Sequence, residues 1–163
     1  PTGSLSMLAD CSPSIEPLFA LSYVKRVMGG KEFFYIDKNF ERAIDELGLH
    51  KEDIIEKVVH HASVRNIEEI PLVLRRVFVV AQEIGPEWHI KMQAAFQKYC
   101  DTAVSKTINF PMSATIRDIE KVYLAAWKHG CKGITIYRDK SKSDQVIQLS
   151  YNIFKQPVKR RRK

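Results

Sequence analysis

The strongest constraint on the fold is a strand–helix–strand pattern in the last third of the chain. Residues 103–110 alternate and are rich in β-branched side chains, which is typical of a strand, and Pro111 ends it. Residues 133–137 (Gly-Ile-Thr-Ile-Tyr) are interpreted as a second strand. Two parallel strands joined by a helix form a β-α-β unit with a right-handed crossover, here over about residues 103–138.

The helix between these strands is marked at both ends. Ser113 or Thr115 can cap its start, and Gly130 terminates it. Its apolar face is expected to comprise Ile116, Ile119, Val122, Tyr123, Ala126 and Trp127. Because a parallel sheet is covered on both faces, we predict an α/β fold in which this unit is one sector of a larger barrel or sheet.

Most of the chain before this unit is predicted to be helical. Residues 33–36 form a strand or a buried loop, and Asp37 or Asn39 can cap the helix that follows. The expected helices cover about residues 17–28, 40–47, 52–62, 71–84 and 88–99. A stripe in the last of them is interpreted as core packing, with His89 as a packing or hydrogen-bonding residue; the stripe is Trp88, Met92, Ala95, Phe96 and Tyr99.

The net positive charge of the chain is concentrated in its last nine residues, which bears on whether a nucleic-acid partner is expected. The 163 residues carry a formal charge of +7, but without the basic tail at residues 155–163 only 20 positive charges face 19 negative ones. A frayed end or a linker is favoured for this tail over a nucleic-acid-binding arm. No apolar run approaches the ~20 residues of a membrane span, and no signal peptide is recognised. With no initiator methionine, the chain is interpreted as a fragment of a longer polypeptide.

The cysteines do not predict a metal site. Cys11, Cys100 and Cys131 are widely separated and form no CxxC pair, so each is interpreted as a buried small hydrophobic residue in a reducing cytoplasm.

The first residues form a small, uncharged, hydroxyl-bearing stretch: Pro1, Thr2, Gly3, Ser4, Leu5 and Ser6. We predict a loop here, in which glycine lets the backbone approach a ligand closely. Backbone amides and hydroxyls that converge on one point suit a phosphate, although such stretches are more often ordinary turns.

Five stretches carry a more specific signal in combination. They are residues 1–6, residues 14–17 (Ser-Ile-Glu-Pro), Tyr23 with Arg26-Val27, residues 103–111 (Ala-Val-Ser-Lys-Thr-Ile-Asn-Phe-Pro) and residues 126–133 (Ala-Trp-Lys-His-Gly-Cys-Lys-Gly). Their order and spacing resemble the large catalytic subunit of ribonucleotide reductase, in the C-terminal part of its ten-stranded α/β barrel. The resemblance covers about residues 1–147. It implies one barrel segment over residues 1–150 and a basic tail or linker over residues 151–163.

The resemblance gives the opening stretch a role. In this family the corresponding segment binds the phosphates of the nucleotide substrate through backbone amides and hydroxyls. The matching positions are Thr2, Gly3, Ser4, Leu5 and Ser6, with Pro1 at the edge. No catalytic or metal-binding residue is expected within this chain.

The final strand bears on the class of reductase. Family members that use a separate metal-radical subunit carry an adjacent tyrosine pair in this strand, but Thr135 and Ile136 hold those positions here. Tyr137 lies one place further on and therefore faces the opposite way from Ile136. The resemblance thus implies the adenosylcobalamin-dependent class, in which the cofactor itself generates a cysteine radical.

Further expectations follow from the resemblance. The radical-bearing cysteine lies upstream in the family, so this chain alone is expected to be inactive and to be one piece of a split, intein-interrupted or truncated enzyme. Expected partners are a ribonucleoside di- or triphosphate, the upstream part of the reductase, a thioredoxin-like or other dithiol reductant and a second copy in a homodimer. We expect a cytoplasmic location and no membrane partner.

Two functions of other kinds remain alternatives. One is a non-catalytic nucleic-acid-binding or scaffolding module that acts through the basic tail, and the other is a stand-alone phosphate-binding protein. Two strands cannot close a barrel, so the isolated chain is expected to aggregate, to dimerise or to need its missing part.

Overall fold

The chain folds into two compact units, and each is described by itself. The computed structural model describes residues 3–9, 11–26, 32–49, 51–61, 63–141 and 147–149. Unit 1 comprises Pro1–Phe19 and Val80–Ser143, whereas unit 2 comprises Ala20–Val79 and Asp144–Lys163. Unit 1 is therefore discontinuous in sequence. The domain boundary predicted at residue 150 stays a prediction, and the basic tail lies outside the described residues.

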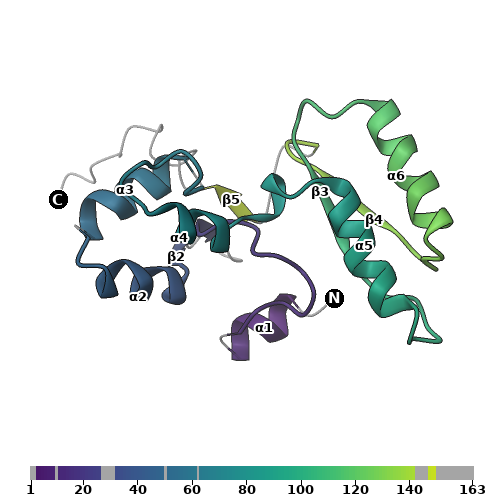
Figure 1. The fold of residues 1–163 in the computed structure, drawn as a ribbon, viewed down its shortest axis with the longest axis horizontal. Coiled ribbons are helices and arrows are strands. Elements are labelled where there is room, and N and C mark those ends of the chain that lie inside the picture. Colours follow the sequence, from purple (N-terminus) through teal and green to yellow (C-terminus); the bar gives the residue numbers. More distant parts are fainter. Residues whose placement is uncertain are drawn as a thin grey trace. The chain divides into compact units, whose positions relative to one another are not determined.

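Unit 1 contains the predicted β-α-β arrangement. Its elements are α1 (Gly3–Ala9), the 3-10 turn η1 (Ala81–Glu83), α5 (Pro86–Gln97), β3 (Thr107–Phe110), α6 (Ile116–Lys128) and β4 (Thr135–Arg138) (Figure 1). β3 and β4 pair in parallel, with Thr107 opposite Thr135 and Phe110 opposite Arg138. The strands are shorter than predicted, because residues 103–106 precede the ladder as irregular backbone.

One face of this strand pair carries the core of unit 1. Ile108 and Phe110 point to the same face, because side chains alternate along a strand, and they pack with Ile90 of α5 and with Val122 and Ala126 of α6. All five are buried. Both helices therefore cover the same face of β3, so among the described residues the sheet has one covered face rather than the two that were predicted.

The predicted ends of α6 are confirmed. Thr115 is the N-cap, and its hydroxyl accepts from the Asp118 amide at 3.3 Å while an Asp118 carboxylate oxygen accepts from the Thr115 amide at 2.9 Å. This reciprocal pair is a capping box. At the other end, Gly130 adopts φ 74°, which glycine tolerates better than other residues.

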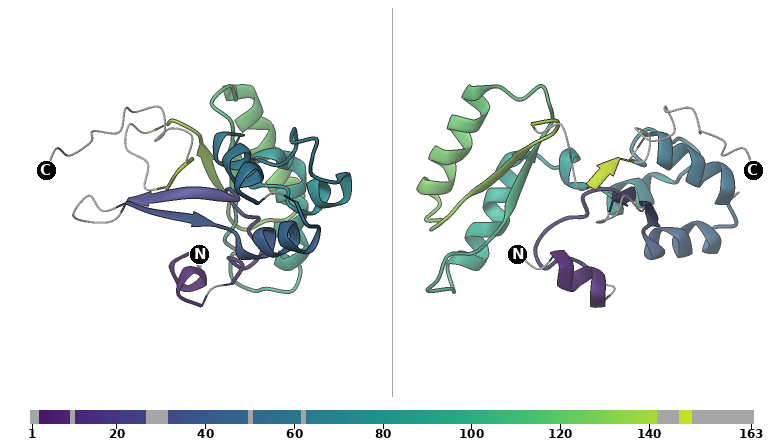
Figure 2. Two further views of the ribbon diagram at one scale, coloured as in Figure 1. Left: turned by 90° about the vertical axis from the view of Figure 1, so that its left-hand side faces the viewer. Right: turned by 180° about the vertical axis from the view of Figure 1, so that it is seen from behind.

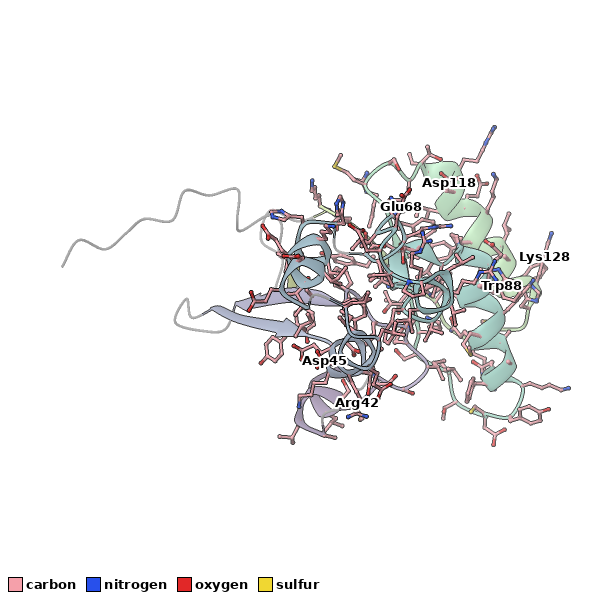
Figure 3. All side chains as sticks on the ribbon, turned by 60° about the vertical axis from the view of Figure 1, so that its left-hand side comes forward. Arg42, Asp45, Glu68, Trp88, Asp118 and Lys128 are labelled. Carbon is pink, nitrogen blue, oxygen red and sulfur yellow. The ribbon has the colours of Figure 1, made fainter. Side chains whose placement is uncertain are left out.

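The predicted packing of α5 is wrong. Trp88 is 61% exposed and Tyr99 80% exposed, and Met92 and Phe96 are also exposed. Figure 3 labels Trp88 on α5. The buried face of this helix consists of His89, Ile90, Gln93 and Gln97. Polar side chains occupy the inner face because they bind backbone groups there, as described below.

Unit 2 is a small antiparallel sheet with helices. Its strands are β1 (Ser22–Arg26), β2 (Glu32–Ile36) and β5 (Ile147–Leu149), in the order β2-β1-β5, and Figure 2 shows β1 and β2 side by side. Its helices are α2 (Lys38–Glu46), α3 (Lys51–His61) and α4 (Leu72–Val77). The predictions for α2 and α3 are confirmed, and the Asp37 carboxylate caps α2 by accepting from the Phe40 amide at 2.8 Å.

Two predicted helices of unit 2 differ from the structure. Residues 22–26 form β1 instead of a helix, because this segment pairs with β2 on one side and β5 on the other. The expected helix at residues 71–84 ends at Val77, and η1 follows after a break. None of the side chains of α4 is buried, so its strongly apolar sequence does not mark a core helix.

The described strands do not close a barrel: β3 and β4 form a two-stranded sheet of their own. Among the described residues, no helix is both long and apolar enough to span a membrane.

Candidate functional site

The predicted phosphate-binding stretch is only partly described. Pro1 and Thr2 lie outside the described residues, and Gly3–Ala9 form helix α1 instead of the predicted loop. Leucine, methionine and alanine dominate the second half of this segment, and they favour a helix. Ser6 is buried, whereas Leu5 and Leu8 are exposed. The assignment of residues 1–6 to phosphate binding stays a prediction.

A short, turned segment leads from α1 to Glu16. The Cys11 amide donates to the Ser6 carbonyl at 3.0 Å, and the Glu16 amide donates to the Pro13 carbonyl at 3.1 Å. Ser14 adopts φ 60°, in the left-handed region that non-glycine residues seldom occupy. The backbone of this segment is therefore folded on itself between α1 and Glu16.

Glu16 meets a buried lysine at the start of β3. The Lys106 ammonium donates to Glu16 Oε2 at 2.8 Å, and the second carboxylate oxygen, Oε1, accepts from the Thr107 amide at 2.5 Å. Lys106 is only 2% exposed, whereas the Glu16 side chain is 26% exposed. A charged lysine this deep needs partners, because an unpaired buried charge is costly.

His89 of α5 completes the cluster. Its Nδ1 lies 2.9 Å from Lys106 Nζ, and its Nε2 lies 3.1 Å from the Ala81 carbonyl oxygen. The carbonyl can only accept, so Nε2 carries the proton and Nδ1 accepts from Lys106. Burial and the neighbouring Lys106 charge lower the pKa of His89, which favours this neutral form.

Two glutamine side chains hold the backbone before the strands. Gln97 makes four hydrogen bonds: its Nε2 donates to the carbonyls of Cys100 and Thr102, and its Oε1 accepts from the amides of Val104 and Lys132. Gln93 Nε2 donates to the carbonyls of Val104 and Gly133, both at 2.8 Å. Gln93 Oε1 is buried and has no hydrogen-bond partner among the described residues. These amides fix the approach of the chain to β3 and β4.

The face of the sheet opposite the helices is polar. Thr107 and Asn109 alternate with the core residues of β3, and the register places Thr135 and Tyr137 of β4 beside them. None of these four side chains is fully buried. We call this row of four residues the open face. It contrasts with the covered face, on which Ile136 also packs.

Sequence patterns did not reveal this cluster. Glu16 and Lys106 both lie in stretches that support the family resemblance, yet they are separated by 90 positions. Gln93 and Gln97 were not predicted to be buried, because the aromatic stripe of the same helix was interpreted as its core face. A buried face that reads His-x-x-x-Gln-x-x-x-Gln at helical spacing is the signal that could have indicated them. The prediction that His89 bonds or packs is confirmed.

The described residues show no metal centre. They contain no group of three or more histidine, cysteine, aspartate or glutamate side chains that could hold an ion. Cys11 and Cys100 are exposed thiols rather than the buried residues that were predicted. Cys131 is partly buried, and this burial raises the pKa of its thiol.

Comparison with known proteins identifies the family. The sequence-family model of the ribonucleotide reductase barrel domain matches residues 1–137. The vitamin B12-dependent ribonucleoside-diphosphate reductase of Thermoplasma acidophilum is 45% identical over 157 residues, which cover 96% of this chain and 20% of that protein. The protein of the same name from Mycobacterium tuberculosis is 37% identical over 150 residues, covering 92% of this chain and 21% of that protein.

A solved structure agrees with these relatives. The alpha subunit of the Actinobacillus ureae class Id ribonucleotide reductase superposes with a TM-score of 0.72 at 30% identity, covering 86% of this chain and 25% of that one. The chain therefore belongs to the ribonucleotide reductase family and corresponds to part of its barrel domain. It spans about a fifth to a quarter of the length of these relatives.

Proposed function

We propose that this chain is the part of an adenosylcobalamin-dependent ribonucleotide reductase that holds the substrate phosphates. The complete enzyme replaces the ribose 2′-hydroxyl by hydrogen to make a deoxyribonucleotide. The observation that carries the proposal is the match of residues 1–137 to the barrel domain, together with relatives named as vitamin B12-dependent ribonucleoside-diphosphate reductases. A nucleoside diphosphate is therefore the first substrate to test.

The residues proposed to hold the phosphates are Pro1, Thr2, Gly3, Ser4, Leu5 and Ser6. Their hydroxyls and amides suit the many acceptor oxygens of a diphosphate. Gly3–Ser6 form the first part of helix α1. Leu5 is exposed and can contribute only its backbone amide to a phosphate.

The buried polar side chains of unit 1 do not fit adenosylcobalamin. Lys106, His89 and Gln97 are buried and already bonded within unit 1, so they offer no free group to so large a cofactor. We therefore place its site in other parts of the complete enzyme and derive no step through it. The radical cysteine, the dithiol reductant, the closed ten-stranded barrel, the homodimer and the cytoplasmic location belong to the same proposal.

A chimera tests the function directly. The part of this chain that matches the Thermoplasma acidophilum reductase, 45% identical over 157 residues, would replace the corresponding segment of that protein. We expect the chimera to reduce ribonucleoside diphosphates when supplied with adenosylcobalamin and a dithiol. The controls are the unaltered Thermoplasma protein and a version without the segment. A folded chimera that binds the cofactor but yields no deoxyribonucleotide would contradict the proposal.

The same chimera tests the phosphate assignment. Ser4→Ala removes one proposed hydroxyl donor and should raise KM for the diphosphate about tenfold, the typical effect of losing a hydrogen bond to a charged group. Ser12→Ala is the matched control, because Ser12 is exposed and lies outside α1. Equal KM values for both variants would remove Ser4 from the site.

A further inference from the structure

We propose that Lys106 is a positioning residue that acts through Glu16 to hold the phosphate-binding segment in place. This inference rests on the proposed function, because it assigns a task to the segment that carries residues 1–6. The geometry behind it is the cluster of Lys106, Glu16 and His89, which joins the segment after α1 to the start of β3 and to α5.

Lys106 does not itself offer a donor to a substrate. Its ammonium has three protons, and three acceptors surround it: Glu16 Oε2 at 2.8 Å, His89 Nδ1 at 2.9 Å and its neighbour's carbonyl, Thr107 O, at 3.3 Å. Its exposed fraction is 2%. An exposed cation next to β3 could attract a phosphate directly, but the Lys106 ammonium is buried and all three of its protons have acceptors, so its effect must pass through its partners.

Glu16 is the partner that transmits the effect. Both of its carboxylate oxygens bind groups at the start of β3, the Lys106 ammonium and the Thr107 amide. Such two-point attachment fixes position as well as distance. Between Glu16 and α1 two backbone hydrogen bonds fold the chain, one from the Glu16 amide to the Pro13 carbonyl and one from the Cys11 amide to the Ser6 carbonyl in α1. The helix that begins at Gly3 is thereby tied to the sheet of unit 1.

His89 orients Lys106 from the opposite side. The bond between its Nε2 and the Ala81 carbonyl presents Nδ1 to the ammonium as an acceptor. The Ala81 amide in turn donates to the Leu18 carbonyl at 2.8 Å, two residues beyond Glu16. Two independent links, one at Glu16 and one at Leu18, therefore bind this segment to the rest of unit 1.

The test uses kinetics in the chimera described above. Lys106→Met keeps the length of the side chain but removes all three donors. We expect KM for the nucleoside diphosphate to rise about tenfold with little change in kcat, because substrate positioning is lost while the reacting groups stay intact. A variant that merely folded less well would lower the amount of active enzyme, and hence the apparent kcat, without moving KM.

Two further variants keep the test decisive. The double variant Lys106→Met/Glu16→Gln removes both charges, so it avoids an unpaired, partly buried carboxylate and should fold even where the single variant does not. It lacks the ion pair, so its KM should stay high. Lys132→Met is the matched control: this exposed lysine donates to a backbone carbonyl, that of Asp101, in the same unit, and its loss should leave KM unchanged.

Amide exchange on the 163-residue chain gives an independent measurement. The amides of residues 11–16 should exchange about tenfold faster in the double variant than in the Lys132→Met control, because local opening becomes easier once the anchor is lost. Unchanged exchange and unchanged KM would overturn the inference while leaving an active chimera, and with it the proposed function, intact. An inactive chimera with faster exchange would instead reject the proposed function and with it the link to phosphate binding.

Discussion

The two faces of the β3–β4 pair differ in what they contribute. The covered face is apolar and buried beneath α5 and α6, whereas the open face carries Thr107, Asn109, Thr135 and Tyr137. In an α/β barrel the helices form the outer layer, so the open face is the side that would line the interior. The same short strands thus pack into the core of unit 1 on one face and carry polar side chains that α5 and α6 do not cover on the other.

The largest effect should come from breaking the covered face. Phe110→Ala removes a buried aromatic ring from the core and should lower the free energy of unfolding by about 3–5 kcal/mol. Asn109→Ala, its neighbour on the open face, should change this free energy by less than about 0.5 kcal/mol. Urea denaturation of both variants measures the contrast. Similar losses in the two would show that the open face is also part of the folded core.

The glutamine anchors should give the next largest effect. Gln97→Leu leaves four backbone groups without their hydrogen-bond partner. We expect it to lower the free energy of unfolding by about 2–3 kcal/mol. Gln93→Leu leaves only two carbonyls without a donor, and it removes a side-chain oxygen that has no partner among the described residues, so it should cost less. Denaturation of the two variants under identical conditions decides the order. The reverse order would mean that the geometry of these amides does not determine their contribution.

A smaller effect should appear as a dependence of stability on pH. The pKa of His89 is lowered in the folded chain, so near and below its ordinary value of 6.5 the unfolded chain binds a proton more readily. Stability should therefore fall as the pH falls below about 6.5, by at most about 1.4 kcal/mol for each pH unit. The groups that face the ring are Lys106, Glu16 and backbone carbonyls, including Ala81.

Comparison of variants isolates this contribution. His89→Gln should flatten the decline in thermal stability between pH 7 and pH 5, whereas replacing the exposed His129 by glutamine should leave it as it was. A decline of equal slope in both variants would assign it to other titrating groups.

Local patterns predicted the β3–α6–β4 part of unit 1 better than they predicted strand β1 of unit 2. The capping box at Thr115, the stop at Gly130 and the parallel pairing all follow from signals within a few residues. By contrast, the apolar spacing of residues 17–28 fits a helix, and only pairing with β2 and β5 makes residues 22–26 a strand. Tertiary partners override propensity in such segments.

In the candidate site, too, local patterns predicted some features and long-range contacts determined the others. The resemblance indicated the stretches that contain Glu16 and Lys106, but their pairing depends on a contact across 90 positions. A hydropathy pattern also could not predict the burial of His89 and Gln93. Polar side chains are buried only where they form hydrogen bonds, here with backbone groups, and such partners are not visible in a hydropathy pattern. The stripe that contains Trp88 was wrongly predicted to be core for the same reason, because hydropathy alone does not determine which face of a helix packs against the core.

The discontinuity of unit 1 has a consequence for synthesis on the ribosome. Glu16 emerges long before Lys106, and at about 5–20 residues per second the intervening stretch takes roughly 5–20 s to make. During that interval the Glu16 carboxylate stays hydrated and lacks its ammonium partner, while all but the last strand of unit 2 can already assemble. The segment that carries Gly3–Ser6 is thus translated well before Lys106, and it gains the Glu16–Lys106 ion pair only after most of unit 2 has been made.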